Sequence, residues 1–147
     1  MSEKTVYLDN NATTMVDPQV FEAMKPYFCD LYGNPSSMHE FGGQVMHAVD
    51  KAREQVKDFL GARDAKEIIF TASGSEGDNM AIRGVLEANK NKKHIITTKI
   101  EHPAVLNVYK YLEKQGYDVT YLDVDSKGNL DLNQLAESIT DETALVS

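Results

Sequence analysis

The sequence contains a single cysteine, Cys29, among its 147 residues. One thiol excludes an intramolecular disulfide, so the fold must hold without one. No apolar run approaches the roughly 20 residues that a membrane-spanning helix needs. No apolar segment follows residues 1–4 in the manner of a secretory signal. We therefore expect a cytoplasmic protein with no membrane partner. Cys29 is expected to be a small, buried apolar side chain.

Positive charge is also scarce. The chain has 15 Lys and Arg against 23 Asp and Glu, which gives a formal net charge of −8. Nucleic-acid affinity rests on Lys and Arg contacts with phosphates, so we expect no nucleic-acid partner. Apolar residues make up 41% and charged residues 26% of the chain, as in an ordinary globular domain. The length suffices for one hydrophobic core.

The amino-terminal third of the chain is predicted to be irregular and helical. Asp17 and Pro18 form a typical helix start, with Asp as the N-cap and Pro at the first helical position. The turn-forming residues 32–37 follow. A longer helix is predicted over residues 43–60, where apolar residues recur with a period near 3.6, and Gly61 suits its carboxyl-terminal cap.

From residue 67 onward, short apolar segments alternate with amphipathic ones. This alternation predicts βαβ units, in which helices flank a mostly parallel sheet and the crossovers are right-handed. The predicted strands cover residues 68–71, 94–98, 119–123 and 144–147. The predicted helices between them cover residues 75–89, 103–115 and 132–139. The fold class predicted from the sequence is therefore α/β.

The first junction that can carry chemistry lies between the predicted strand at residues 68–71 and the next helix. Ligands of open parallel sheets bind outside the carboxyl ends of the strands. Gly74 lets the backbone approach a ligand, and the free N–H groups of the following helix favour an anion. Ser75 can add a hydroxyl donor to a phosphate. Ser73 and Glu76 also fit a capping box, so capping alone is the simpler explanation of this segment.

The second junction contains His102, which directly precedes Pro103, the predicted first residue of a helix. A histidine at the carboxyl end of a strand would point into the same crevice as Gly74 and Ser75. The alternative is a histidine that is satisfied by a loop carbonyl. The two junctions together favour a binding site more strongly than either one alone.

A third candidate is the polar segment at residues 8–14, whose Asn and Thr side chains suit turns and can present donors to a carboxylate. The other histidines, His39, His47 and His94, show no metal-ligand spacing with one another or with Cys29. We interpret them as surface or structural residues and predict no metal site.

Four segments of the chain stand out in order: Leu8 to Thr14, Gly33-Asn34-Pro35-Ser36-Ser37-x-His39, Phe70 to Asn79, and Glu101-His102-Pro103-Ala104-Val105. In their order and spacing, these segments resemble those of cysteine desulfurases. The resemblance is to the branch that includes the nitrogen-fixation and housekeeping iron–sulfur cluster enzymes, and it covers essentially the whole chain. That family has the aminotransferase class V fold, also called fold type I. It uses pyridoxal 5'-phosphate to take sulfur from L-cysteine, leaving alanine and an enzyme persulfide.

Carried over by position, the resemblance implies that Gly74 and Ser75 hold the cofactor phosphate. It implies that His102 stacks on the pyridine ring and assists proton transfer. The substrate side would be lined by Asn11, Ala12 and Thr13. Where the family usually has Gly-Ala-Thr-Glu at the phosphate loop, this chain has Ser73-Gly74-Ser75-Glu76. The hydroxyl is kept at Ser75, while Gly74 adds backbone freedom.

The resemblance also implies parts of the enzyme that this sequence does not contain. The Schiff-base lysine, the aspartate that pairs with the pyridine nitrogen, the mobile cysteine and a small carboxyl-terminal domain are expected downstream. Residues 1–15 would form a substrate-side segment, and residues 16–147 the first part of the large cofactor-binding domain. We expect the full-length protein to be a homodimer that passes sulfur to an acceptor or iron–sulfur scaffold protein.

The 147-residue chain alone is expected to be inactive. The alternatives are a non-catalytic remnant or pseudoenzyme that binds another desulfurase chain, and a selenocysteine lyase of the same fold.

Overall fold

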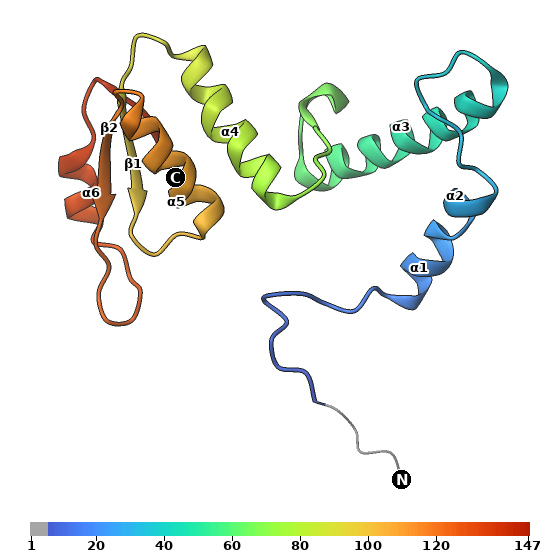
Figure 1. The fold of residues 1–147 in the computed structure, drawn as a ribbon, viewed down its shortest axis with the longest axis horizontal. Helices are drawn as coiled ribbons and strands as arrows, with labels where there is room; N and C mark the ends of the chain where they lie inside the picture. The colour runs from blue at the N-terminus through green and yellow to red at the C-terminus, as the bar shows by residue number, and fades with distance from the viewer. Residues whose placement is uncertain (1–5) are drawn as a thin grey trace. The chain divides into compact units, whose positions relative to one another are not determined.

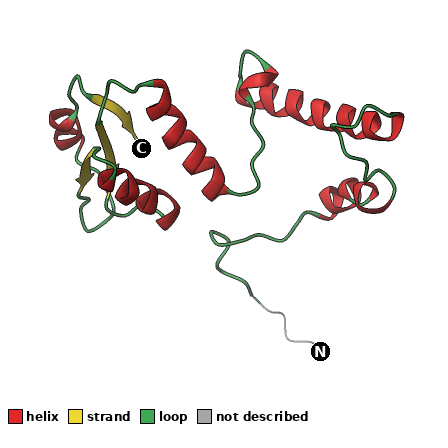
Figure 2. Ribbon diagram, turned by 45° about the horizontal axis from the view of Figure 1, so that its top comes forward, coloured by secondary structure: helices red, strands yellow, loops and turns green. Residues whose placement is uncertain are grey.

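The computed structural model describes residues 6–147, which divide into two compact units, the first ending at Ile69 and the second beginning at Phe70 (Figure 1). The first unit is helical, whereas the second contains both helices and a sheet (Figure 2). Within residues 6–147, no helix combines the length and the apolarity that crossing a membrane requires.

The first unit begins with two short helices, α1 (Pro18–Met24) and α2 (Pro26–Cys29). The predicted start of α1 is confirmed: the Asp17 carboxylate caps the helix and accepts a hydrogen bond from the Gln19 N–H at 2.7 Å. Cys29, which we expected to be buried, is exposed. It is the last residue of a four-residue helix that packs chiefly against α1.

The long helix α3 (Glu40–Leu60) begins three residues earlier than predicted. His39 caps it, because the Nδ1 atom of His39 accepts a hydrogen bond from the Gly42 N–H at 3.2 Å. The preceding turn packs tightly here: a Cβ atom on Gly42 would lie 2.5 Å from the carbonyl oxygen of Asn34. Gly61 closes the helix in the left-handed conformation, as predicted, with φ +70°. A short 3₁₀ helix, η1 (Ala65–Glu67), follows.

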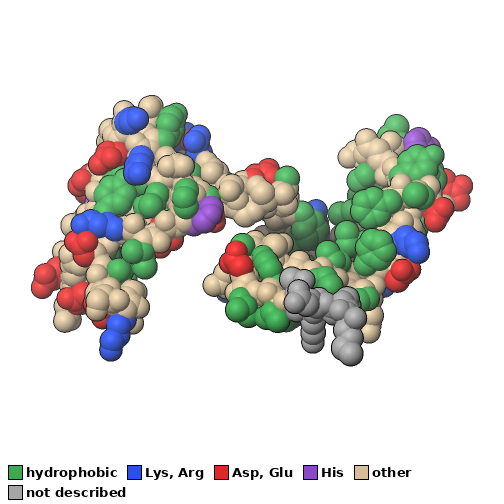
Figure 3. Space-filling model, turned by 60° about the horizontal axis from the view of Figure 1, so that its bottom comes forward, with side chains coloured by type: hydrophobic (Ala, Val, Ile, Leu, Met, Phe, Trp, Pro, Cys, Tyr) green, Lys and Arg blue, Asp and Glu red, His purple; other side chains and the backbone are tan. Residues whose placement is uncertain are grey.

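Apolar side chains are poorly covered in the first unit, where only Gly42 and Ile68 are buried among the described residues. Figure 3 shows apolar side chains on the surface of this unit. The exposed large apolar residues of α1 and α2 are Val20, Phe21, Met24, Tyr27 and Phe28. The helices of this unit are therefore set by their caps and turns more than by a shared core.

The second unit contains a three-stranded parallel sheet with the order β2-β1-β3. Its strands, β1 (His94–Thr98), β2 (Asp118–Leu122) and β3 (Thr143–Val146), confirm three of the four predicted strands.

The predicted strand at residues 68–71 is wrong, because this segment pairs with no strand of the described chain. A strand needs a hydrogen-bonded neighbour, and the three-stranded sheet does not include residues 68–71. In addition, the carbonyl of Ile68 accepts a hydrogen bond from the Arg53 guanidinium instead of joining a ladder.

Helices α4 (Gly74–Ala88) and α5 (Pro103–Lys114) pack on each other and on the sheet, and α6 (Leu132–Ser138) packs along β2. The chain passes through α5 from β1 to β2 and returns through α6 to β3 on the other side of β1. Right-handed crossovers therefore place α5 and α6 on opposite faces of the sheet. The core under α4 and α5 consists of Ile82, Leu86, Ile95, Val108, Tyr109 and Leu112.

His94 ties the three strands together near their amino ends. Its side chain is buried, with Nδ1 lying 2.8 Å from the Thr143 hydroxyl of β3 and Nε2 lying 2.9 Å from the Thr120 hydroxyl of β2. Both ring nitrogens are thus hydrogen-bonded. The interpretation of His94 as a structural residue fits these contacts.

Candidate functional site

The amino terminus of α4 is capped by residues on both sides of its first turn. The Ser73 hydroxyl accepts a hydrogen bond from the Glu76 N–H at 3.2 Å, and the Glu76 carboxylate accepts one from the Ala72 N–H at 2.5 Å. The predicted capping pair is therefore present, although Glu76 bonds one residue before the cap. Asn79 supports the same turn, because its Nδ2 donates to the Ser75 carbonyl at 2.8 Å.

These caps leave the N–H groups of Gly74 and Ser75 at the first two helical positions, where no carbonyl of the helix can accept from them. No atom lies within 4 Å of the position that a Cβ atom on Gly74 would occupy, and Ser75 is exposed. An open backbone, two donors and a hydroxyl at the positive end of a 15-residue helix fit a phosphate group.

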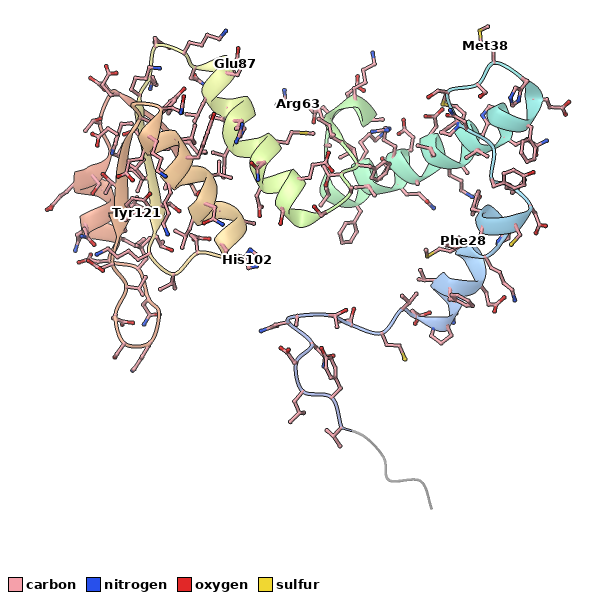
Figure 4. All side chains as sticks on the ribbon, in the orientation of Figure 1. Phe28, Met38, Arg63, Glu87, His102 and Tyr121 are labelled. Carbon is pink, nitrogen blue, oxygen red and sulfur yellow. The ribbon has the colours of Figure 1, made fainter. Side chains whose placement is uncertain are left out.

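His102 stands at the corresponding place on α5, where it is the N-cap residue. Its Nδ1 accepts a hydrogen bond from the Ala104 N–H at 3.1 Å, so a neutral ring in this geometry carries its proton on Nε2. The residue is exposed, and Figure 4 shows the ring at the start of α5, directed away from the strands. The free Nε2–H edge and the open ring face are available to a planar ligand.

Helices α4 and α5 line a shared hollow. Its lining residues are Asn79, Arg83, Pro103, Ala104, Asn107, Val108 and Tyr111. The Arg83 guanidinium lies over the Tyr111 ring, 4.9 Å from its centroid, and so holds the two helices together through a cation–π contact. The hollow reaches the first turn of α5 at Pro103 and the second turn of α4 at Asn79, and neither Ser75 nor His102 lines it.

The topology places the amino ends of α4 and α5 at the same edge of the sheet. Helix α5 follows the carboxyl end of β1, and α4 precedes the amino end of β1 while packing against α5 and β3. The amino ends of α4 and α5 therefore belong to the carboxyl edge of the strands, where ligands of parallel sheets bind. Direct convergence of Gly74, Ser75 and His102 on one ligand stays a prediction.

The polar segment of the first unit forms a turn. The Ala12 N–H donates to the Asp9 carbonyl at 3.1 Å, and Asn11, Ala12 and Thr13 are all exposed. Their predicted place on the substrate side stays a prediction, as does the division at residue 15. Within residues 6–147, no group of three or more His, Cys, Asp or Glu side chains could hold a metal ion.

Sequence reasoning missed Thr98, the last residue of β1, and Glu101, in the loop that leads to His102. The Thr98 hydroxyl donates to the Glu101 carboxylate at 3.0 Å, and both side chains are half-buried. The only available signal was the position of Glu101 directly before the candidate histidine at the end of a strand.

The profile of the aminotransferase class-V family matches residues 6–147 of the chain. A cysteine desulfurase of Nostoc sp. is 64% identical over 142 residues, which are 97% of this chain and 35% of that protein. The cysteine desulfurase NifS of Azotobacter vinelandii is 51% identical over the same share of each chain. This chain thus spans about a third of the length of the curated relatives that it matches.

Solved structures give the same assignment. A NifS-like protein superposes with a TM-score of 0.90 at 44% identity, covering 96% of this chain and 39% of that one. A second structure, SspA in complex with cysteine, superposes with a TM-score of 0.88 at 40% identity and covers 97% of this chain and 41% of the other. With the α/β topology and the family match over 6–147, these likenesses show that the chain belongs to the aminotransferase class-V family.

Proposed function

We propose that this chain is the amino-terminal part of a cysteine desulfurase that binds pyridoxal 5'-phosphate and takes sulfur from L-cysteine. The observation that carries the proposal is the 64% identity to the Nostoc desulfurase across 97% of the chain. It is supported by SspA, a 40% identical protein whose solved structure is a complex with cysteine. The products would be L-alanine and an enzyme persulfide.

Within this proposal, the start of α4 binds the phosphate. The N–H groups of Gly74 and Ser75 and the Ser75 hydroxyl donate to its oxygens, and the helix dipole favours its negative charge. The caps described above keep these donors free, because Glu76 is engaged by the Ala72 N–H. Pyridoxal phosphate, when bound, supplies the electron sink for bond cleavage at the substrate carbons.

His102 is proposed to stack its ring on the pyridine ring and to move a proton through Nε2. Its own N-cap hydrogen bond to Ala104 fixes the ring orientation and the tautomer. The turn at Asn11, Ala12 and Thr13 is proposed to present donors on the substrate side. Proposed partners of the full-length protein are L-cysteine, a second copy of the chain, and a sulfur acceptor or iron–sulfur scaffold protein.

The function is tested on the full-length protein that contains this sequence. It should release alanine from L-cysteine in the presence of pyridoxal phosphate, and it should sediment as a dimer. The Ser75→Ala variant should bind pyridoxal phosphate more weakly by roughly 1–3 kcal/mol, the scale of a hydrogen bond to a charged group. Ser75→Thr keeps the hydroxyl and should restore most of that affinity.

Cofactor affinity is measured by equilibrium dialysis of the apo-protein. Equal affinity of the Ala variant and the wild type would remove Ser75 from the phosphate site. Absence of alanine release by the wild type would contradict the desulfurase assignment itself.

A further inference from the structure

The loop between β1 and α5 is short and fixed at both ends. The Lys99 N–H donates to the Leu122 carbonyl at 3.0 Å, which continues the β1–β2 ladder one residue past β1. At the other end, His102 caps α5 through its side chain and accepts with its carbonyl from the Val105 N–H at 2.9 Å. The path of the three residues between Thr98 and His102 therefore determines where the His102 ring stands.

Of these three loop residues, only Glu101 turns inward. Lys99 and Ile100 are exposed, whereas Glu101 is half-buried. Its Oε1 atom accepts a hydrogen bond from the Thr98 hydroxyl at 3.0 Å. This contact joins the last residue of β1 to the residue immediately before His102, and it closes the loop on itself.

The Glu101 carboxylate also acts electrostatically on a buried group of α5. The phenol of Tyr109, whose pKa is raised first by burial, is raised further by the Glu101 carboxylate.

We propose that Thr98 and Glu101 form a brace that positions His102, with Glu101 acting as a hydrogen-bond acceptor rather than as a group that touches the ligand. The proposal rests on the proposed function for its catalytic consequence. Its structural consequence, an ordered start of α5, is independent of that function. Removing the brace should let the loop and the N-cap move while leaving the core under α5 in place.

The brace needs a hydroxyl donor at residue 98 and an oxygen acceptor at residue 101. Thr98→Val and Glu101→Ala each remove the hydrogen bond, whereas Thr98→Ser and Glu101→Gln each keep a donor or an acceptor at the same position. The double variant Thr98→Val/Glu101→Ala should be no worse than the worse single variant, since both changes break one contact. All five variants leave Gly74, Ser75 and His102 unchanged.

The first measurement is hydrogen–deuterium exchange of the full-length apo-protein over the peptide that contains the Ala104 N–H. We expect exchange to become at least about fivefold faster in Thr98→Val and Glu101→Ala, because the hydrogen bond from Ala104 to His102 opens more often. The Ser and Gln variants should exchange at the wild-type rate. Unchanged exchange in the Val and Ala variants would overturn the brace, and equal acceleration in all four would show a general packing defect instead.

The second measurement is steady-state turnover of L-cysteine by the same proteins with pyridoxal phosphate bound. Because a displaced His102 affects the reacting geometry more than binding, kcat should fall about tenfold in the Val and Ala variants with KM little changed. The Ser and Gln variants should retain wild-type kcat. A wild type without turnover but with the predicted exchange pattern would contradict the proposed function alone. If the wild type turns over L-cysteine and the Thr98→Val and Glu101→Ala variants have the same kcat, the positioning role alone would be contradicted.

Discussion

Two tyrosines of the second unit differ in whether the buried hydroxyl has a hydrogen-bond partner. Tyr109 is fully buried, and its hydroxyl donates to the Ser147 Oγ at 2.9 Å and lies 3.3 Å from the Ile96 carbonyl. The hydroxyl oxygen of Tyr121 is also buried, but it has no hydrogen-bond partner in the described part of the chain. The two side chains pack against the same core, so they form a matched pair.

We predict that Tyr109→Phe lowers the free energy of unfolding by about 1 kcal/mol, because it removes the hydrogen bond from the buried Tyr109 hydroxyl to the Ser147 Oγ. Tyr121→Phe removes a hydroxyl that makes no hydrogen bond and should change stability by less than about 0.5 kcal/mol or increase it. Urea unfolding of the two variants at pH 7, followed by circular dichroism, measures the difference. A larger loss for Tyr121→Phe would mean that its hydroxyl has a partner after all.

The same two phenols make the fold sensitive to alkali. Burial raises the pKa of Tyr109 and of Tyr121 above the usual 10.0, so the folded state holds their protons more tightly than the unfolded chain. Their contribution is complete below pH 10 and is lost as the pH rises through the raised folded values. In urea unfolding repeated above pH 10, the double Phe variant should lose less stability than the wild type.

At the scale of one element, α3 offers two glycines with opposite requirements. Gly61 ends the helix with φ +70°, a conformation that side chains with a Cβ atom adopt at a cost. Gly43 lies inside the same helix, where no atom would meet an added Cβ within 4 Å. The space around Gly61 is equally open, so backbone conformation alone separates the two positions.

We predict that Gly61→Ala destabilises the first unit by about 1 kcal/mol, whereas Gly43→Ala stabilises it by about 0.5–1 kcal/mol. The readout is the temperature dependence of the helical circular dichroism signal for the two variants and the wild type. Stabilisation by both substitutions would show that residue 61 can leave the left-handed region without loss of the cap.

Elements were predictable where local chemistry decides them. The strands β1, β2 and β3 were predicted to within a residue or so because each is a short apolar segment between clear helix signals. The segment at residues 68–71 has the same composition, yet pairing partners decide strand formation, and the Ile68 carbonyl is used by Arg53. The pattern of apolar residues in the sequence does not show whether a strand partner or the Arg53 guanidinium takes the Ile68 carbonyl.

The candidate site divides in the same way. His102 was found as a candidate because it follows the carboxyl end of a predicted strand, and the start of α4 was found from its capping pair. Both signals depend on neighbours in sequence. The hydrogen bond from Thr98 to Glu101 depends on the path of a loop in three dimensions, and a Glu in a loop is ordinarily exposed. The start of α3 was missed for a related reason, since histidine is an uncommon N-cap.

At the scale of the whole chain, acidic side chains raise the pKa of two lysines and so favour their charged form. Lys57 has a raised pKa because it donates hydrogen bonds to Glu54 and to Asp58. Lys90 has a raised pKa because of its hydrogen bond to Glu87. Attack on the aldehyde of pyridoxal phosphate requires a neutral amine, so these pairings act against it.

The last prediction concerns this 147-residue chain by itself. Mixed with pyridoxal phosphate and reduced with borohydride, it should show labelling well below one equivalent, spread over several lysines, and it should yield no alanine from L-cysteine. The reason is that a covalently held cofactor needs a lysine that is both neutral and positioned beside the phosphate site, whereas Lys57 and Lys90 have pKa values shifted in the opposite direction. Peptide mapping of the reduced chain locates the label, and Ser75→Ala serves as the control for labelling that depends on the phosphate site. Stoichiometric labelling of one lysine, lost in Ser75→Ala and accompanied by alanine release, would place the whole catalytic apparatus within these residues.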